Sequence, residues 1–228
     1  MHLLHHKTLV AALALAAGSA STAVTAVAKP LPVVENFALL DHEGRFHELD
    51  YYCRLPSAKG IVLFVQGNGC PLVRKRFPEL ERMKANYGKE GILFGMLNAN
   101  PQDEREDILE EAKEFEVDIP ILKDEAQLVA AMLGIGRTAE AFLIDTESKK
   151  VVYRGAIDDR LSYEAEKPKA EKHYLRDAIE ALLGGREIPT PITDAPGCKV
   201  AMPPAERAIS YTDEIAPLLM RRCVTCHT

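Results

Sequence analysis

The sequence predicts an α/β fold in which helices cover both faces of a mixed central sheet. Short apolar runs alternate with amphipathic helical segments along most of the chain. The runs at 61–65 and 92–97 are apolar throughout, as expected for strands buried on both faces. Two further strands, at 141–144 and 151–154, are close enough in sequence to form an antiparallel hairpin, which makes the sheet mixed in direction.

Two short strands are expected before the first central strand, at 33–40 and 46–52, with turn residues between them. The first central strand ends in Gly67-Asn68-Gly69-Cys70-Pro71. Proline suits the first position of a helix, and apolar residues recur at helical spacing from there to Met83. One helix is therefore expected over 71–83.

The second half of the chain continues the alternation. An acidic amphipathic helix is expected over 103–115, with its apolar side chains turned inward. A short strand at 119–122 leads to Asp124, which suits the cap of a helix that runs to Leu133. The last helix of the domain is expected over 174–183.

The first 28 residues have the layout of a secretory signal peptide. A weakly basic start precedes an apolar run at 8–17, and small residues lead to Ala26-Val27-Ala28 before Lys29. An uncleaved amphipathic anchor is the alternative. Because no other segment is long and apolar enough to cross a bilayer, the mature chain is expected to have no membrane span and to be periplasmic or otherwise extracytoplasmic in a bacterium.

The composition is that of a globular protein. Hydrophobic residues make up 47% and charged residues 27% of the chain, which excludes a disordered protein. The formal net charge of −6 gives no electrostatic case for binding nucleic acid. Without the signal peptide, about 200 residues remain, enough for one domain and a fragment of another.

The last residues include Cys223-Val224-Thr225-Cys226-His227, which has the spacing of a c-type haem attachment site. The two thiols would add across the haem vinyl groups, and His227 would bind the iron as an axial ligand. A disulfide or half of a zinc site would use the same two cysteines. The motif therefore predicts haem c as the covalent cofactor and leaves open whether this chain alone holds it; the second iron ligand is expected from further domains beyond Thr228.

A proline-rich linker is expected over 188–209, and a short helix capped by Thr212-Asp213-Glu214 then leads into the haem motif. In cytochromes c the first helix leads into the attachment site in this way. Residues 210–228 thus resemble the start of a cytochrome c domain that is truncated here, and the chain is expected to be a piece of a larger protein.

The remainder of the chain resembles the thioredoxin-fold redoxins. The segment 61–80 has Cys-Pro at a strand-to-helix turn, Phe37-x-Leu-x-Asp-x-x-Gly44 precedes it, and Ala141–Asp145 with Val151–Gly155 follows. The group includes the alkyl hydroperoxide reductase/thiol-specific antioxidant proteins and the exported thiol:disulfide oxidoreductases. This resemblance implies a thioredoxin-like redoxin domain over 29–187, and redoxin domains followed by a haem c domain occur in larger exported bacterial proteins.

Cys70 is the candidate redox-active residue of that domain. A thiol at a helix N-terminus faces unpaired backbone N–H groups and the positive end of the helix dipole, which favour the thiolate. Arg74, Lys75 and Arg76 follow within the first turns and would add positive charge. The alternatives are an inert structural Cys70 and a basic cluster that is only a solvated helix face.

Three positions depart from the pattern of the family. Val73 stands where thioredoxins have the second cysteine of Cys-x-x-Cys, and Gly67 stands where peroxiredoxins have a threonine or serine that helps to bind peroxide. Arg137-Thr138-Ala139-Glu140 replaces the loop with a cis-proline that usually faces the active-site cysteine. A trans loop is expected there, because a cis bond without proline costs about 3 kcal/mol. Arg137 is either a second charge near Cys70 or a surface residue.

Three thiols remain if the terminal pair carries haem, namely Cys53, Cys70 and Cys198. Cys198 lies in the turn-rich segment 194–198. We expect a mobile stretch there to bring Cys198 to Cys70 as its resolving partner, or to pair it with Cys53. The simpler interpretation is that Cys53 is a buried residue of a strand or strand end.

Three functions remain open from the sequence. The first is a thiol–disulfide oxidoreductase that acts through Cys70 and is coupled to the haem module. The second is a thiol peroxidase that uses the same thiolate. The third is a non-catalytic redoxin scaffold for a cytochrome c domain. The expected partner is a redox protein or a small thiol or peroxide substrate.

Overall fold

The computed structural model of the 228-residue chain describes residues 31–202, 211 and 215–222. A five-stranded sheet has the order β5-β4-β3-β6-β7. The strands are β3 (Gly60–Gln66), β4 (Ile92–Asn98), β5 (Ile121–Lys123), β6 (Ala141–Asp145) and β7 (Val151–Gly155). The pairs β3–β4 and β4–β5 are parallel, and β3–β6 and β6–β7 are antiparallel. The mixed sheet confirms the predicted fold class.

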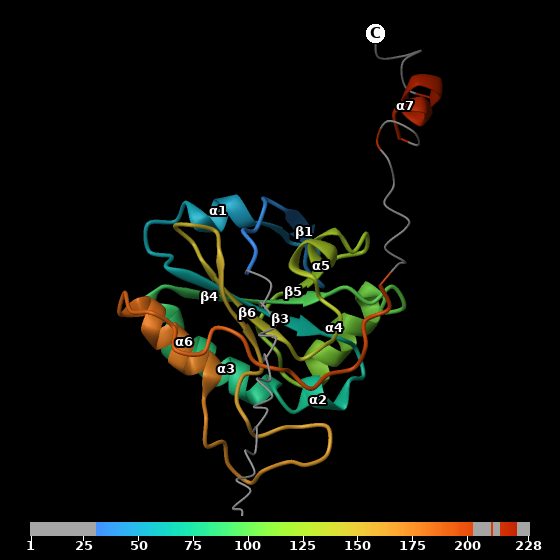
Figure 1. Cartoon of the computed structure of the whole chain (residues 1–228). Coiled ribbons are helices and arrows are strands. Elements are labelled where there is room, and N and C mark those ends of the chain that lie inside the picture. The colour runs from blue at the N-terminus through green and yellow to red at the C-terminus, as the bar shows by residue number, and fades with distance from the viewer. Residues whose placement is uncertain (1–30, 203–210, 212–214, 223–228) are drawn as a thin grey trace, which may run out of the picture. The chain divides into compact units, whose positions relative to one another are not determined.

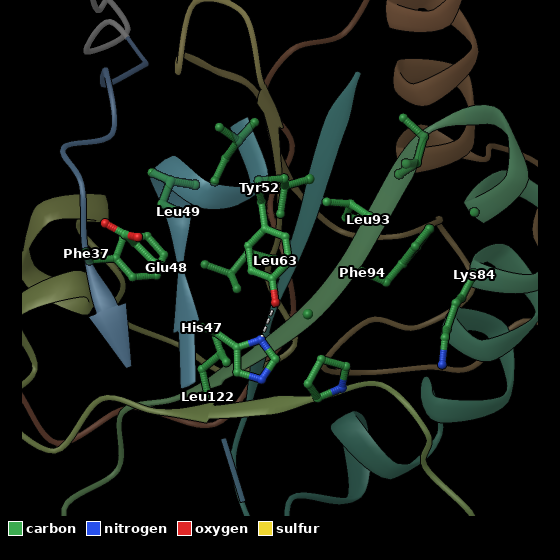
Figure 2. Close-up of a pocket in the computed structure, with 16 residues that line it drawn as sticks. Phe37, His47, Glu48, Leu49, Tyr52, Leu63, Lys84, Leu93, Phe94 and Leu122 are labelled. Carbon is green, nitrogen blue, oxygen red and sulfur yellow. Dashed lines mark hydrogen bonds between the residues drawn. The ribbon is translucent and has the colours of Figure 1, made fainter. Parts of the chain in front are cut away.

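A small antiparallel sheet of β1 (Ala38–Leu40) and β2 (Phe46–Glu48) precedes β3. The predicted strand at 46–52 was wrong in its second half, because the chain turns into the short helix α1 (Leu49–Cys53). Cys53 therefore ends a helix and not a strand. Burial of Leu49 and the acidic Asp50 in the first turn favour the helix. Figure 2 shows His47 of β2 hydrogen-bonded to Tyr52 of α1.

The segment expected as one helix over 71–83 forms two, α2 (Pro71–Arg74) and α3 (Phe77–Tyr87). Pro78 explains the break, because it has no N–H to donate to the carbonyl of Arg74. The remaining helical segments are η1 (Gly88–Glu90), α4 (Arg105–Glu114), α5 (Leu128–Leu133), α6 (Tyr174–Leu183) and α7 (Ala216–Arg222). The helices predicted near the ranges of α4, α5, α6 and α7 are thus present. No helix among the described residues is long and apolar enough to cross a membrane.

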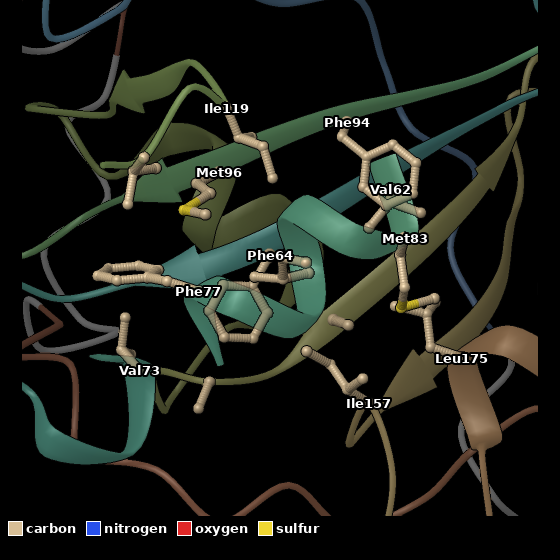
Figure 3. Close-up of a cluster of buried hydrophobic side chains, with 14 of the residues drawn as sticks. Val62, Phe64, Val73, Phe77, Met83, Phe94, Met96, Ile119, Ile157 and Leu175 are labelled. Atoms are coloured by element: carbon tan, nitrogen blue, oxygen red, sulfur yellow. The ribbon is translucent and has the colours of Figure 1, made fainter. Parts of the chain in front are cut away.

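Helices cover both faces of the sheet, with α3 and α6 on one side and α1 and α5 on the other (Figure 1). Alternate residues of β3 point to the two faces. Val62 and Phe64 pack with Phe77 and Met96 in the core cluster under α3 and α6 (Figure 3). Ile61, Leu63 and Val65 pack in the second cluster, under α1 and α5.

The first part of the predicted linker, residues 188–202, packs against the domain. Ile188 lies against the cluster under α3 and α6, and Val200 is buried in the cluster on the opposite face. Residue Ile192 forms a parallel bridge to Arg154 of β7. These contacts carry the chain across the end of the sheet where β3 stops.

Candidate functional site

Cys70 follows the end of β3 and caps the N-terminus of α2, with Pro71 at the first helical position. This is the strand-to-helix turn that the sequence predicts. The Cys70 side chain is buried, with 5% of the residue exposed, and belongs to the cluster that contains Val73. A thiol this buried is available to groups that the fold brings to it and, of molecules in solution, to small ones.

Cys198 is the group that the fold brings to it. The Sγ atoms of Cys70 and Cys198 lie 2.9 Å apart, although 128 residues separate them in the sequence. Both thiols are free, since a disulfide would require about 2.05 Å. Cys198 is exposed, whereas Cys70 is buried. Cys53 packs against the core cluster on the opposite face of the sheet, so the structure places Cys198 beside the first of its two expected partners.

Residues 197–200 are held beside the loop that precedes β6. The Thr138 N–H donates to the Cys198 carbonyl at 2.9 Å, and Arg137 and Lys199 form an antiparallel bridge. Gly197 allows the close approach, because a β-carbon on it would lie 1.8 Å from the Thr138 carbonyl oxygen. The exposed cysteine is therefore fixed by main-chain bonds and not by its own side chain.

Thr138 is the residue of the candidate site that the sequence reasoning missed. Its Oγ1 lies 3.3 Å from the Cys70 sulfur and accepts a hydrogen bond from the Cys198 N–H at 3.0 Å. The hydroxyl hydrogen is then free to point at the Cys70 sulfur. Because β6 runs antiparallel to β3, the loop before β6 lies beside the loop after β3, and only this pairing, which the sequence analysis did not predict, places residue 138 near Cys70.

Gly67 and the 137–140 loop fit together around that hydroxyl. A β-carbon on Gly67 would lie 2.6 Å from the Thr138 methyl carbon, so glycine makes room for the threonine side chain. The described residues contain no cis peptide bond, which agrees with the trans loop expected here. Ala139 adopts φ of 59° and its N–H donates to the Val65 carbonyl at 2.7 Å.

The two thiols have opposite pKa shifts. Burial works against the Cys70 thiolate, but hydrogen bonds from Cys198, from Thr138 and from the backbone N–H groups of Val73 and Cys198 lower the pKa of Cys70. The hydrogen bond to Cys70, together with burial, raises the pKa of Cys198. The pair is thus arranged as a Cys198 thiol that donates to a Cys70 thiolate.

The arginines expected to add charge near Cys70 have other partners. Arg74 Nε lies 2.5 Å from Oε1 of the buried Glu111, and its guanidinium lies over the Phe115 ring. Arg137 Nη1 donates to the Gly197 carbonyl at 3.2 Å and its guanidinium lies over the ring of Tyr163. Arg137 therefore supports the segment that carries Cys198.

The alternative that the basic cluster 74–76 is only a solvated helix face does not hold for Arg76. Its side chain is buried: Arg76 is 3% exposed and its Nη1 lies 2.7 Å from Asp158 Oδ1.

The residues of the terminal haem motif, Cys223, Cys226 and His227, lie outside the described residues. Within the part of the chain that is described, no group of three or more His, Cys, Asp or Glu side chains could hold a metal ion.

Comparison with known proteins identifies one family and many solved structures of similar fold. The family model described as Redoxin matches residues 23–173. No curated protein matches the sequence.

Among solved structures, an uncharacterised conserved protein of Geobacillus kaustophilus is 28% identical, with a TM-score of 0.68 over 78% of this chain and 94% of that chain. A hypothetical protein of Sinorhizobium meliloti is 24% identical, with a TM-score of 0.67 over 77% of this chain and 95% of that chain. A thiol:disulfide interchange protein of the thioredoxin family from Chlorobium tepidum is 16% identical, with a TM-score of 0.52 over 69% of this chain and 99% of that chain. These similarities show a thioredoxin-like fold.

Proposed function

We propose that this chain, which belongs to the Redoxin family, catalyses thiol–disulfide exchange through a redox pair formed by Cys70 and Cys198. The observation that carries the proposal is the separation of 2.9 Å between the two sulfurs. Closing the Cys198 thiol and the Cys70 thiolate into a disulfide releases two electrons and one proton. A substrate disulfide takes up the two electrons, with that proton and one from water, and becomes two thiols, and the reverse reaction oxidises a substrate dithiol.

The exposure of the two sulfurs assigns their roles. In the oxidised protein a substrate thiolate attacks the Cys198 sulfur, which is exposed, and the Cys70–Cys198 bond breaks. Cys70 leaves as a thiolate, which the Thr138 hydroxyl and the Val73 N–H stabilise. A thiol of lower pKa is the better leaving group, so the direction of both pKa shifts favours this step. The mixed disulfide therefore forms on Cys198.

A second substrate thiolate completes the cycle. It attacks the substrate sulfur of the mixed disulfide, the substrate leaves as a disulfide, and Cys198 is released and takes up a proton. For reduction of a substrate the same steps run backwards, and the Cys70 thiolate attacks the Cys198 sulfur of the mixed disulfide. Val73 stands where a Cys-x-x-Cys protein has its resolving cysteine, and Cys198 supplies that thiol from outside the helix.

Peptide mapping without reduction tests the pair. The protein is oxidised in a Cys223→Ser/Cys226→Ser background, its free thiols are alkylated, and the peptides are identified by mass spectrometry. We expect a linked Cys70–Cys198 peptide and an alkylated Cys53. Exchange with a small disulfide should be lost in Cys70→Ser and Cys198→Ser and kept in Cys53→Ser. Three alkylated thiols after oxidation, or equal activity in all three variants, would contradict the proposal.

A thiol peroxidase is the second candidate, and the Thr138 hydroxyl beside the Cys70 sulfur favours it. A peroxide would oxidise the Cys70 thiolate to a sulfenic acid, and Cys198 would then displace water to give the same disulfide. Rates of the reduced protein with hydrogen peroxide and with a small disulfide separate the two functions. A faster reaction with peroxide identifies the peroxidase, whereas an unreactive Cys70 with the ordinary pKa of a free thiol identifies a scaffold.

Haem attachment and export are proposed from the sequence motifs alone. We propose that Cys223 and Cys226 carry haem c through thioether bonds, that His227 binds the iron, and that residues 1–28 direct export. The haem would supply one-electron transfer next to the redoxin domain. Expression with a c-type maturation system should give a haem-stained band on a denaturing gel, lost in Cys223→Ala/Cys226→Ala, and a mature N-terminus at Lys29. Absence of the stain would contradict the haem proposal, and an intact Met1 would contradict the cleavage.

A further inference from the structure

A cavity of about 270 Å³ lies at the first half of β4, and its wall includes the β2–α1 segment, side chains from both faces of the sheet and Lys84 of α3. It shares no lining residue with the Cys70–Cys198 site. Most of its wall is apolar, and the labelled side chains in Figure 2 include Phe37, Leu49, Leu63, Leu93, Phe94 and Leu122. A buried cavity of about 150 Å³ lined by such side chains binds benzene, so this one has room for a larger ring system.

Two features of the sheet leave this space open: β5 pairs with only part of β4, and Gly95 of β4 has no side chain. β5 pairs only with Met96–Asn98, so within the described residues the first half of β4 has β3 as its one neighbouring strand. Gly95 lies in that half, where a glycine weakens a strand and often marks close approach of a ligand. A β-carbon there would be 3.8 Å from the nearest atom of Leu63 and 4.0 Å from the Pro120 carbonyl. Packing therefore does not require glycine, and the missing side chain leaves space.

A chain of three polar side chains ends in the wall of the cavity. The buried Asp41 accepts hydrogen bonds at Oδ1 from two backbone N–H groups and at Oδ2 from His47 Nε2, at 2.9 Å. An Nε2 that donates leaves Nδ1 of a neutral imidazole as an acceptor. In this neutral form of His47, Tyr52 Oη, 2.6 Å from Nδ1, donates its only hydrogen to His47. The Tyr52 oxygen is left with lone pairs and no hydrogen to give.

The charged groups at the cavity are already engaged. Lys84 Nζ lies 2.5 Å from Asp118 Oδ2, and Glu48 Oε1 accepts a hydrogen bond from Asn36 at 3.0 Å. Neither ion therefore needs a charged ligand. Phe37, Phe94 and Tyr52 add aromatic rings to the wall, which pack best against another flat ring.

We propose that this cavity binds a small neutral aromatic molecule of the phenol class. Its ring packs against the Phe37, Leu49 and Leu63 side chains, which lie on the same face of the sheet as Tyr52, and its O–H donates to Tyr52 Oη. The proposal does not rest on the thiol chemistry of Cys70 and Cys198, because the cavity shares no lining residue with that site.

Fluorescence titration with 2-naphthol tests the proposal, with 2-methoxynaphthalene as the probe that lacks the donor. The chain has no tryptophan, so the naphthol is excited without interference from the protein. The unaltered chain should bind 2-naphthol about tenfold more tightly than the methyl ether, as expected for one hydrogen bond in an apolar site. Tyr52→Phe should remove that difference and leave the binding of the ether unchanged. Equal binding of the two probes by the unaltered chain, or no saturable binding, would overturn the proposal.

Gly95 provides the second variant, which tests the location of the site. Gly95→Leu should fill the cavity and abolish binding of both probes, while the melting temperature stays equal or rises and thiol exchange is unchanged. If Gly95→Leu fails to fold, Gly95→Ala, whose β-carbon makes only ordinary contacts, should weaken binding of both probes severalfold. Cys70→Ser should bind both probes like the unaltered chain. Undiminished binding in the Gly95 variant that folds would place the ligand elsewhere and overturn the proposal.

Discussion

The α-carbon of Gly197 lies so close to Thr138 that a β-carbon would sit 1.8 Å from the Thr138 carbonyl oxygen. This contact joins the two parts of the candidate site. Thr138 holds the backbone of Cys198 through its N–H and its hydroxyl, and the same hydroxyl lies 3.3 Å from the Cys70 sulfur. The placement of Cys198 thus depends on Thr138 and on the close approach of Gly197, and neither residue is part of the thiol pair.

Gly197→Ala should separate the two thiols. Any side chain at 197 pushes residues 197–200 away from Thr138, and a displacement of about 1 Å can cost a factor of about 100 in rate. We expect the Cys70–Cys198 disulfide to form at least about tenfold more slowly, measured by timed alkylation after addition of oxidant. Gly136→Ala is the matched control, because a β-carbon there meets nothing within 4 Å. An unchanged rate in Gly197→Ala would show that this contact does not position Cys198.

Thr138→Val should raise the pKa of Cys70. A hydrogen bond to the thiolate stabilises the charged form, so its removal shifts titration to higher pH. In the reduced protein the Cys70 thiolate should titrate below the ordinary value of about 8.5 for a free thiol, and the midpoint should move upward in the variant. Ultraviolet absorbance of the thiolate against pH gives both midpoints, with Cys70→Ser as the blank. A midpoint unmoved by Thr138→Val would assign the lowered pKa to Cys198 and the backbone alone.

The same shift predicts a pH dependence of stability. A cysteine whose pKa is lowered on folding stabilises the folded state above its unfolded pKa, and that contribution is lost as pH falls through the folded value. The reduced protein should therefore lose stability relative to Cys70→Ser as pH falls through the range of the folded pKa. Urea unfolding at a series of pH values measures the difference. A difference that is constant with pH would contradict the lowered pKa.

Asp158→Asn should destabilise the protein strongly. Arg76 and Asp158 are both buried, and removal of one charge leaves the other without a partner, which costs about 3–5 kcal/mol. Urea unfolding should show this loss in the free energy of unfolding. Glu164→Gln, an exposed carboxylate in the same loop region, should stay within about 0.5 kcal/mol of the unaltered chain. A loss below about 1 kcal/mol in Asp158→Asn would mean that water reaches Arg76.

Gly67→Ser should fail to create a better peroxide site. It places a hydroxyl three residues before Cys70, where peroxiredoxins have one, but its β-carbon would lie 2.6 Å from the Thr138 methyl carbon and 2.8 Å from Asn100 Nδ2. The collision displaces Thr138, so the second-order rate constant with hydrogen peroxide should fall. Stopped-flow measurement of the reduced protein tests this, with Gly136→Ser as the control, because a β-carbon at 136 meets nothing within 4 Å. A rise in the rate would show that the loop accommodates a side chain at 67.

The sequence predicted the central strands and the Cys70 turn because local signals determine them. Fully apolar runs such as 61–65 have no other stable place than the middle of a sheet, and Pro71 marks the start of its helix without help from distant residues. Local signals also misled at two points. Residues 49–53 were predicted to continue a strand, because their helical conformation depends on burial of Leu49. The basic run 74–76 was predicted to be either a charge source or a solvated face, but Arg76 is buried.

The partner of Cys198 could not be chosen from the sequence. Its position is set by main-chain bonds to Thr138, and the segment that carries it has the proline-rich composition of a linker. Neither the composition of that segment nor its distance along the chain says which side of the sheet it crosses. The contacts of Thr138 could not be predicted for the same reason, because a threonine can lie between Cys70 and Cys198 only where Gly67 and Gly197 leave room on both sides.

Occupation of the Thr138 edge by the chain itself has a consequence for substrate size. The Thr138 N–H and hydroxyl are both engaged by Cys198, so an extended peptide that sought the same groups would have to displace residues 197–200 first. A small thiol has no such need, because it reaches the exposed sulfur of Cys198 directly. For the proposed thiol–disulfide exchange, the occupied edge therefore predicts that compact thiols react faster than extended polypeptides.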